Sequence, residues 1–150
     1  MTNDGHPLRP SDASRGMRKN ILLIEDNLSF SPSGQEQLEA MGHSVVVCPN
    51  AKASVSRLLD ERFDVIVLDL SISSSALEGM GVIQSTRAMA LPIPPIVITS
   101  GHDRTLIEWA AAKIQAFRWL QKPVADEQLA EMIEHATSPR PAWSREMLAA

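Results

Sequence analysis

The sequence predicts an α/β fold in which five parallel strands form one open, doubly wound sheet flanked by five helices. Short apolar runs rich in Ile and Val alternate with longer stretches in which apolar residues recur at helical spacing. Three of these runs are apolar on both alternations, which is typical of strands buried on both faces of a parallel sheet. A closed eight-stranded barrel needs about 250 residues. The chain has 150, so the sheet is expected to be open.

The predicted strands and helices alternate along the whole chain. The strands span residues 21–24, 44–48, 65–70, 96–99 and 117–120. Three amphipathic helices are predicted by apolar residues at helical spacing, namely Val55, Leu58 and Leu59, then Leu106, Ala110 and Ile114, then Leu129, Met132, Ile133 and Ala136. Two weaker helices are predicted at 31–41, where Ser31 and Pro32 suit a helix start, and at about 79–89.

The composition predicts one mildly acidic domain. The formal net charge of −4 argues against a general affinity for nucleic acid or anionic membranes. Cys48 is the only cysteine, so a reducing, cytoplasmic compartment is expected. No apolar run approaches the roughly 20 residues of a membrane span, and residues 1–20 lack the apolar centre of a secretory signal. We expect residues 20–137 to fold, with flexible tails at 1–19 and 138–150.

Polar side chains stand where four of the predicted strands end. Glu25 and Asp26 follow the first strand, Asp69 ends the third, Ser100 follows the fourth and Lys122 follows the fifth. Doubly wound sheets bind their ligands at this edge. Converging carboxylates repel one another and favour a cation such as Mg²⁺, while a lysine and a hydroxyl suit an anionic oxygen. The pattern therefore predicts a phosphoryl-transfer site with Mg²⁺ as its cofactor.

A flavin nucleotide is the competing ligand for a sheet of this kind. A flavin phosphate is held by hydroxyls and backbone donors in the loop after the first strand. Residues 25–28 instead read Glu-Asp-Asn-Leu and place negative charge there. The G-x-G-x-x-G and G-x-x-x-x-G-K-[ST] phosphate-binding motifs are also absent. Flavin and nucleotide binding are therefore disfavoured.

Four motifs together resemble the receiver domain of bacterial two-component response regulators, of the single-domain, chemotaxis-regulator-like kind. The motifs are KNILLIEDN (19–27), DVIVLDL (64–70), PIVITSG (95–101) and LQKP (120–123), and the resemblance covers residues 19–137. It implies a flavodoxin-like sheet of five parallel strands in the order 2-1-3-4-5, with five helices.

The resemblance also implies roles for the acidic residues. Asp69 would take the phosphoryl group as an aspartyl phosphate. Asp26 would bind Mg²⁺ directly and Glu25 through a water molecule, with Asp69 and the backbone carbonyl of Ser71 as further ligands.

The resemblance assigns the remaining positions as well. Lys122 would pair with a phosphoryl oxygen, and the peptide bond before Pro123 would be cis. Ser100 would hydrogen-bond the phosphoryl group and act as a switch residue. It is preferred to Thr99 because the small Gly101 follows it and Pro95 fixes the register, although a slip of one residue would exchange the two. Trp119 is either the aromatic switch of the family or a packed strand residue.

Two departures from the family pattern are visible. The run LSISSSALEGMG (70–81) lacks the usual Met-Pro pair and is lengthened, which puts the rate of phosphorylation and the kinase-docking rim in doubt. Ile114-Gln115-Ala116 also replaces the glycine that usually precedes the fifth strand.

The predicted function is that of a phosphoacceptor which catalyses its own phosphorylation and hydrolysis and is not otherwise an enzyme. Its partners would be a histidine kinase or histidine phosphotransfer protein and a downstream effector protein. The effector would be contacted through the fourth helix, fifth strand and fifth helix, and a homodimer is conceivable. Direct nucleic-acid binding and membrane insertion are not expected. The alternatives are a scaffold that works without phosphorylation and a phosphate sink.

Overall fold

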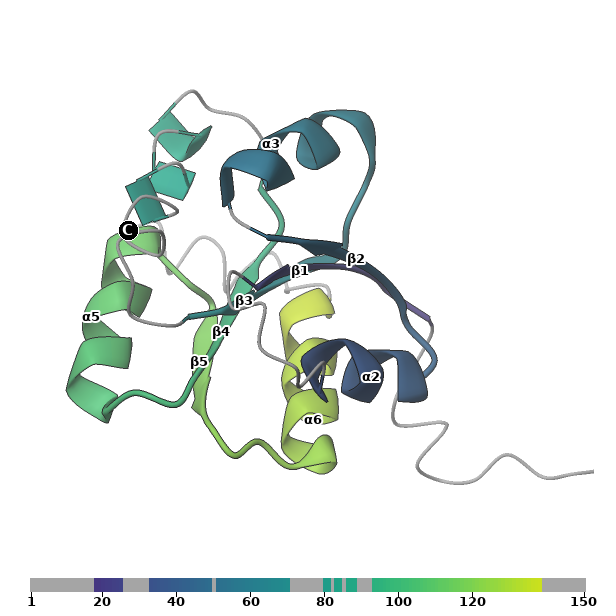
Figure 1. The fold of residues 1–150 in the computed structure, drawn as a ribbon, viewed down its shortest axis with the longest axis vertical. Helices are drawn as coiled ribbons and strands as arrows, with labels where there is room; N and C mark the ends of the chain where they lie inside the picture. The colour runs from purple at the N-terminus through teal and green to yellow at the C-terminus, as the bar shows by residue number, and fades with distance from the viewer. Residues whose placement is uncertain are drawn as a thin grey trace, which may run out of the picture.

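Five strands form one parallel sheet in the computed structural model, in the order β2-β1-β3-β4-β5 (Figure 1). The structure describes residues 18–25, 33–49, 51–70, 80–81, 83–84, 86–88 and 93–138. The strands are β1 (Asn20–Glu25), β2 (Ser44–Cys48), β3 (Val65–Asp69), β4 (Ile96–Ser100) and β5 (Arg118–Gln121). This is the flavodoxin-like order that the resemblance implied, so the predicted fold class is confirmed.

Helices cover both faces of the sheet. They are α2 (Ser33–Ala40), α3 (Ala51–Asp60), α5 (Arg104–Ile114) and α6 (Asp126–Thr137). The described residues between 80 and 88 are helical as well. Figure 1 shows α2 and α6 on one side of the sheet and α3 and α5 on the other. The five predicted helices are therefore present, the first four between successive strands and α6 after β5.

Alternate strand residues build two separate cores, one on each face of the sheet. Leu23, Val67 and Val97 pack with Leu38 of α2 and Leu129 of α6. The opposite core contains Leu22, Ile24, Ile66, Leu68, Ile96, Ile98, Met80, Ile83, Ile107, Ala110 and Ile114. The central strands are apolar without interruption because both of their faces are covered by helices.

Some element ends differ from the prediction by one or two residues. The register pairs Arg118 with Val97, and β5 therefore begins one residue later than expected. The helix predicted at 31–41 is observed from Ser33 to Ala40, and residues 31–32 lie outside the described residues. It ends before Gly42, which adopts the left-handed backbone conformation with φ 94°.

The turn before β5 contains a second left-handed residue, Gln115, with φ 53°. It caps α5, and its N–H donates to the carbonyl of Ala112. A side chain in this conformation costs roughly 1 kcal/mol relative to glycine. The replacement of the usual glycine by Gln115 therefore affects stability through the backbone conformation.

The two predicted tails lie almost wholly outside the described residues. Of residues 1–19, only Arg18 and Lys19 are described, and the N–H of Lys19 donates to Nδ1 of His43 at 3.1 Å. Of residues 138–150, only Ser138 is described, and its hydroxyl donates to the carbonyl of Glu134 at 2.6 Å. Lys19 and Ser138 are therefore tied to the domain.

Candidate functional site

The site lies where β1, β3 and β4 end side by side. Glu25 is the register partner of Asp69, and Asp69 is the register partner of Thr99. Neighbouring strands lie about 4.8 Å apart, so partners in a parallel ladder project side chains next to one another from the same face. This arrangement puts the two carboxylates side by side at the carboxyl edge of the sheet, as the strand-end pattern predicted, together with Thr99, the residue before Ser100.

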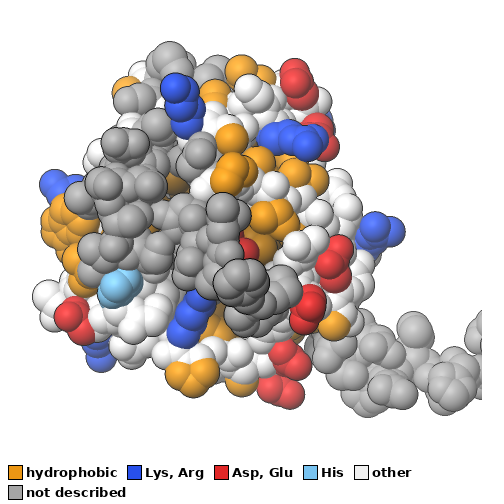
Figure 2. Space-filling view, in the orientation of Figure 1, with side chains coloured by type: hydrophobic (Ala, Val, Ile, Leu, Met, Phe, Trp, Pro, Cys, Tyr) orange, Lys and Arg blue, Asp and Glu red, His pale blue; other side chains and the backbone are white. Residues whose placement is uncertain are grey.

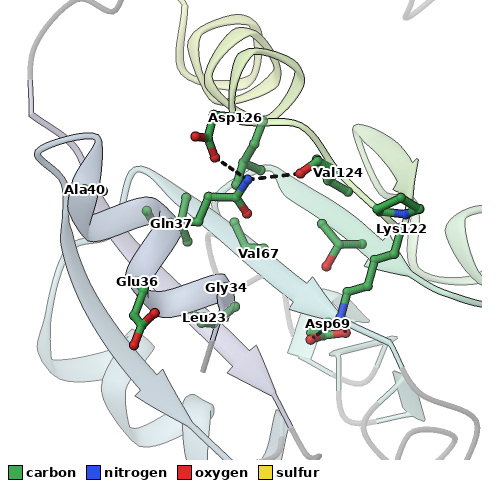
Figure 3. Close-up of a pocket in the computed structure, with 14 residues that line it drawn as sticks. Leu23, Gly34, Glu36, Gln37, Ala40, Val67, Asp69, Lys122, Val124 and Asp126 are labelled. Carbon is green, nitrogen blue, oxygen red and sulfur yellow. Dashed lines mark hydrogen bonds and ion pairs between the residues drawn. The ribbon is translucent and has the colours of Figure 1, made fainter. Parts of the chain in front are cut away.

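Lys122 reaches back across the edge of the sheet to Asp69. Its Nζ lies 2.9 Å from Oδ1 and 2.8 Å from Oδ2 of Asp69 (Figure 3). The Lys122 backbone N–H donates to the carbonyl of Ser100 at 2.7 Å, and the peptide bond to Pro123 is cis. The Asp69 side chain is 13% exposed, whereas that of Lys122 is 43% exposed. The carboxylate is thus held in a recess and the lysine covers it from the solvent side.

Thr99, and not Ser100, shares the cavity with Asp69 and Lys122. This placement does not test the switch role expected of Ser100, which stays a prediction. Successive residues of a strand point to opposite faces, and the register gives Thr99 the face of Asp69. The pairing of Asp69 with Thr99 across two strands is a property of the assembled sheet, which the sequence of one strand does not show.

Ser100 has a structural position on the other face of the sheet. It is completely buried. Its hydroxyl donates to the carbonyl of Leu70 at 2.8 Å and accepts the N–H of His102 at 3.2 Å. Ser100 therefore connects the ends of β3 and β4 at the backbone level.

A cavity of about 820 Å³ extends from Asp69 between α2 and α6. Its polar rim includes Gln37, Asp126 and Glu36. Figure 3 shows the side chain of Gln37 pointing toward Asp126. The full lining is Leu23, Gly34, Glu36, Gln37, Leu38, Ala40, Val67, Asp69, Thr99, Lys122, Pro123, Val124, Asp126 and Leu129. Sequence reasoning missed Gln37, because nothing in a polar helix position signals which strand-end loop it will contact.

The predicted metal ligands are only partly in view. Glu25 lies at the end of β1 beside Asp69, while Asp26 and Ser71 lie outside the described residues. Within the described ranges, no group of three or more His, Cys, Asp or Glu side chains converges. Glu25 and Asp69 are register partners, and their carboxylates offer oxygen atoms, which are the ligand type that Mg²⁺ prefers.

Trp119 lies on β5 and packs, partly buried, against the core that contains Ile98. The guanidinium carbon of Arg104 lies 5.7 Å from the centre of its ring. Arg104 is also paired with Glu108 one turn along α5, at 2.8 Å. The indole is therefore both a packed strand residue and part of the α5–β5 surface, which is compatible with either of its predicted roles.

Charge is mixed over the described surface near the site. Figure 2 shows acidic and basic side chains interspersed on this face, without a field of one sign.

No helix of the described residues is long and apolar enough to cross a lipid bilayer.

Comparison with known proteins identifies the family. The sequence profile of the response regulator receiver domain matches residues 21–134. The chain therefore belongs to the response regulator receiver domain family, the receiver class of two-component signalling.

The chain is similar to proteins with longer sequences and to isolated receiver domains. It is 31% identical to the transcriptional regulatory protein CrdR of Helicobacter pylori over 119 residues, which are 79% of this chain and 54% of CrdR. It is 29% identical to the transcriptional regulatory protein FixJ of Bradyrhizobium diazoefficiens, over 78% of this chain and 56% of FixJ.

Solved structures share the fold. The chemotaxis response regulator CheY4 of Vibrio cholerae superposes with a TM-score of 0.64 at 19% identity, over 80% of this chain and 99% of CheY4. The chain spans about a quarter to just over half of the length of the curated relatives it matches.

Proposed function

We propose that Asp69 accepts a phosphoryl group from a phosphohistidine of a kinase or phosphotransfer protein, and that the resulting aspartyl phosphate changes a protein-binding surface. The observation that carries this proposal is the pairing of Lys122 Nζ with both carboxylate oxygens of Asp69. These residues are 53 positions apart in the sequence, so their contact is a product of the tertiary fold. A recessed carboxylate with one cation above it is suited to receive an anionic group.

Glu25, Asp26, Asp69 and the carbonyl of Ser71 would hold Mg²⁺. The position of Glu25 beside Asp69 fits this proposal, because adjacent carboxylates supply the oxygen ligands that a divalent cation favours. When bound, the ion would supply charge neutralisation for the oxygens of the phosphoryl group and of Asp69.

The residues of the chain then perform the transfer by positioning and charge. An oxygen of Asp69 attacks phosphorus in line, a new O–P bond forms, and the P–N bond of the phosphohistidine breaks, with the electron pair leaving on the imidazole. The ammonium group of Lys122, which pairs with the Asp69 carboxylate before transfer, would pair with a phosphoryl oxygen after it. The hydroxyl that donates to another phosphoryl oxygen would be that of Ser100, as the family pattern implies, or that of Thr99, which the register puts on the face of Asp69.

The output is a binding event at the surface formed by α5, β5 and α6. Trp119 with Arg104 above it, and Trp109 at 44% exposure, provide aromatic and cationic contact area there. Phosphorylation would shift a pre-existing equilibrium between two forms of this surface by the difference in phosphate affinity between them. The effector is a protein, the protein acts in the cytoplasm, and self-association through the same surface is a further expectation.

The experiment is the intact mass of the protein after incubation with acetyl phosphate and Mg²⁺. We expect one phosphoryl adduct, which disappears in Asp69→Asn and when EDTA removes the metal. Asp126→Asn, which alters another acid of the cavity rim, is the matched control and should keep the adduct. If neither acetyl phosphate nor a phosphorylated kinase yields an adduct, the phosphorylation-independent scaffold replaces this proposal.

A further inference from the structure

Gln37 of α2 contacts the segment that follows Lys122. Its Nε2 donates to the carbonyl of Val124 at 3.1 Å and to Oδ1 of Asp126 at 2.7 Å (Figure 3). Both partners are acceptors, so the two hydrogens of one amide group are both used. One side chain thus joins α2 to the loop that leads into α6.

These contacts hold the backbone on the far side of Lys122. On the near side, the Lys122 N–H is held by the carbonyl of Ser100 in β4. Gln37 holds Val124, two residues beyond the lysine, and Asp126 at the first turn of α6. The Lys122 side chain is flexible and half-exposed, and the direction in which it leaves the sheet is set by this backbone.

We propose that Gln37 is a positioning residue for the phosphoryl-transfer site, acting through the 122–126 segment on the lysine that pairs with Asp69. The inference rests on the proposed function of Asp69. It adds a residue from α2, the first described element after Asp26 in the chain. Its amide connects α2 to the segment that follows the lysine.

A purely structural link between α2 and α6 would make a different prediction. Such a link would contribute to the free energy of unfolding and leave the chemistry of correctly folded molecules unchanged. A positioning residue instead changes the rate at saturating donor, because misplacement of a charged group raises the barrier without changing how donor binds.

The test compares Gln37→Leu with the wild type and with Gln35→Leu. Gln35 is the matched control, because it lies on the same helix and its side chain makes no hydrogen bond within the described residues. The phosphorylation rate is measured as a function of acetyl phosphate concentration with saturating Mg²⁺. We expect Gln37→Leu to lower the maximal rate about ten-fold, with less than about a two-fold change in half-saturating concentration. Gln35→Leu should behave as the wild type.

Asp126→Asn provides a rescue within the same contact. Asparagine retains an Oδ1 acceptor for Gln37, so the maximal rate should stay within about two-fold of the wild type. Asp126→Leu removes the acceptor and should move the rate toward that of Gln37→Leu.

A second readout is independent of phosphorylation. In ¹⁵N-resolved NMR spectra, Gln37→Leu should shift the amide signals of Lys122, Val124 and Asp126 while those of α5 stay in place. Unchanged Lys122 signals in Gln37→Leu would overturn the positioning role. So would a maximal rate in Gln37→Leu equal to that of a wild type that does become phosphorylated. A wild type that forms no adduct overturns the proposed function itself, and the NMR shifts then still decide whether Gln37 holds the loop.

Discussion

The two faces of the sheet are built from the same kinds of residue but are filled differently. Beneath α5 and the described helical residues 80–81, 83–84 and 86–88, Ile107, Ile114 and Met80 pack onto the strands in a continuous core. Beneath α2 and α6, Leu38 and Leu129 also pack onto the strands, yet a cavity of about 820 Å³ opens beside them and reaches Asp69.

Because the two faces are packed differently, we expect one face to contribute mainly to stability and the other mainly to the chemistry at Asp69. On the filled face, almost every buried atom contacts another, so removal of atoms leaves a void that costs stability. On the hollow face, part of the surface of Leu129 already borders empty space, and the polar side chains at the rim are arranged around Asp69. Substitutions on the two faces should therefore change different measured quantities.

The largest effect is expected for Ile107→Ala on the filled face. Ile107 is completely buried, and its loss should lower the free energy of unfolding by about 3.5 kcal/mol in urea titrations. Leu129 borders the cavity, so Leu129→Ala should lower the free energy of unfolding by only about 2 kcal/mol, since fewer packing contacts are lost. Equal losses at the two positions would show that the faces do not differ in packing.

The next effect is expected for Lys122→Met, which acts on the chemistry. Loss of the cation that faces Asp69 should slow phosphorylation by acetyl phosphate about 100-fold, equivalent to about 2.7 kcal/mol of barrier. The free energy of unfolding should change by less than about 1 kcal/mol, because the lysine is half-exposed. Lys113→Met on α5 is the control, and a similar slowing there would remove the special role of Lys122.

Ser100→Ala and Thr99→Val sharpen the comparison at adjacent residues. Ser100→Ala removes the hydroxyl that bonds the Leu70 carbonyl and the His102 N–H. This loss should lower the free energy of unfolding by about 1–2 kcal/mol. Thr99→Val keeps the shape of the side chain. It should mainly alter the phosphorylation rate or the lifetime of the adduct. The reverse result, with Ser100→Ala slowing transfer in a stable protein, would assign the phosphoryl contact to Ser100.

The smallest effect is expected at Gln115, away from both cores. Glycine adopts a φ of 53° without steric cost, so Gln115→Gly should raise the free energy of unfolding by about 0.5–1 kcal/mol. Thermal unfolding would detect this as a higher midpoint. A lower midpoint would mean that the glutamine side chain contributes more than its backbone conformation costs.

Much of the fold was predictable because the signals are local. The apolar runs of β1, β3 and β4 predict buried strands, and the apolar spacing in α3, α5 and α6 predicts helices that cover them. The family motifs also placed Asp69 and Lys122 at strand ends. The role of Asp69 as phosphoacceptor remains a prediction, and Asp26 and Ser71 lie outside the described residues.

The choice between Thr99 and Ser100 and the contact of Gln37 were not predictable in this way. Both depend on which residues face each other across separate elements: the register of β3 with β4 in the first case, and the approach of α2 to the loop after β5 in the second.

The sequence by itself determined the order of strands and helices along the chain, the two-sided burial of the central strands and the presence of Glu25, Asp69 and Lys122 at the strand ends. It could do so because hydrophobic periodicity and motif spacing are properties of short segments. Only the tertiary structure decided which hydroxyl shares the cavity with Asp69, that Lys122 covers the carboxylate, and that Gln37 holds the lysine-bearing loop. Each of these contacts joins residues from different strands or helices, and their relative placement follows from the packing of the whole sheet and its helices.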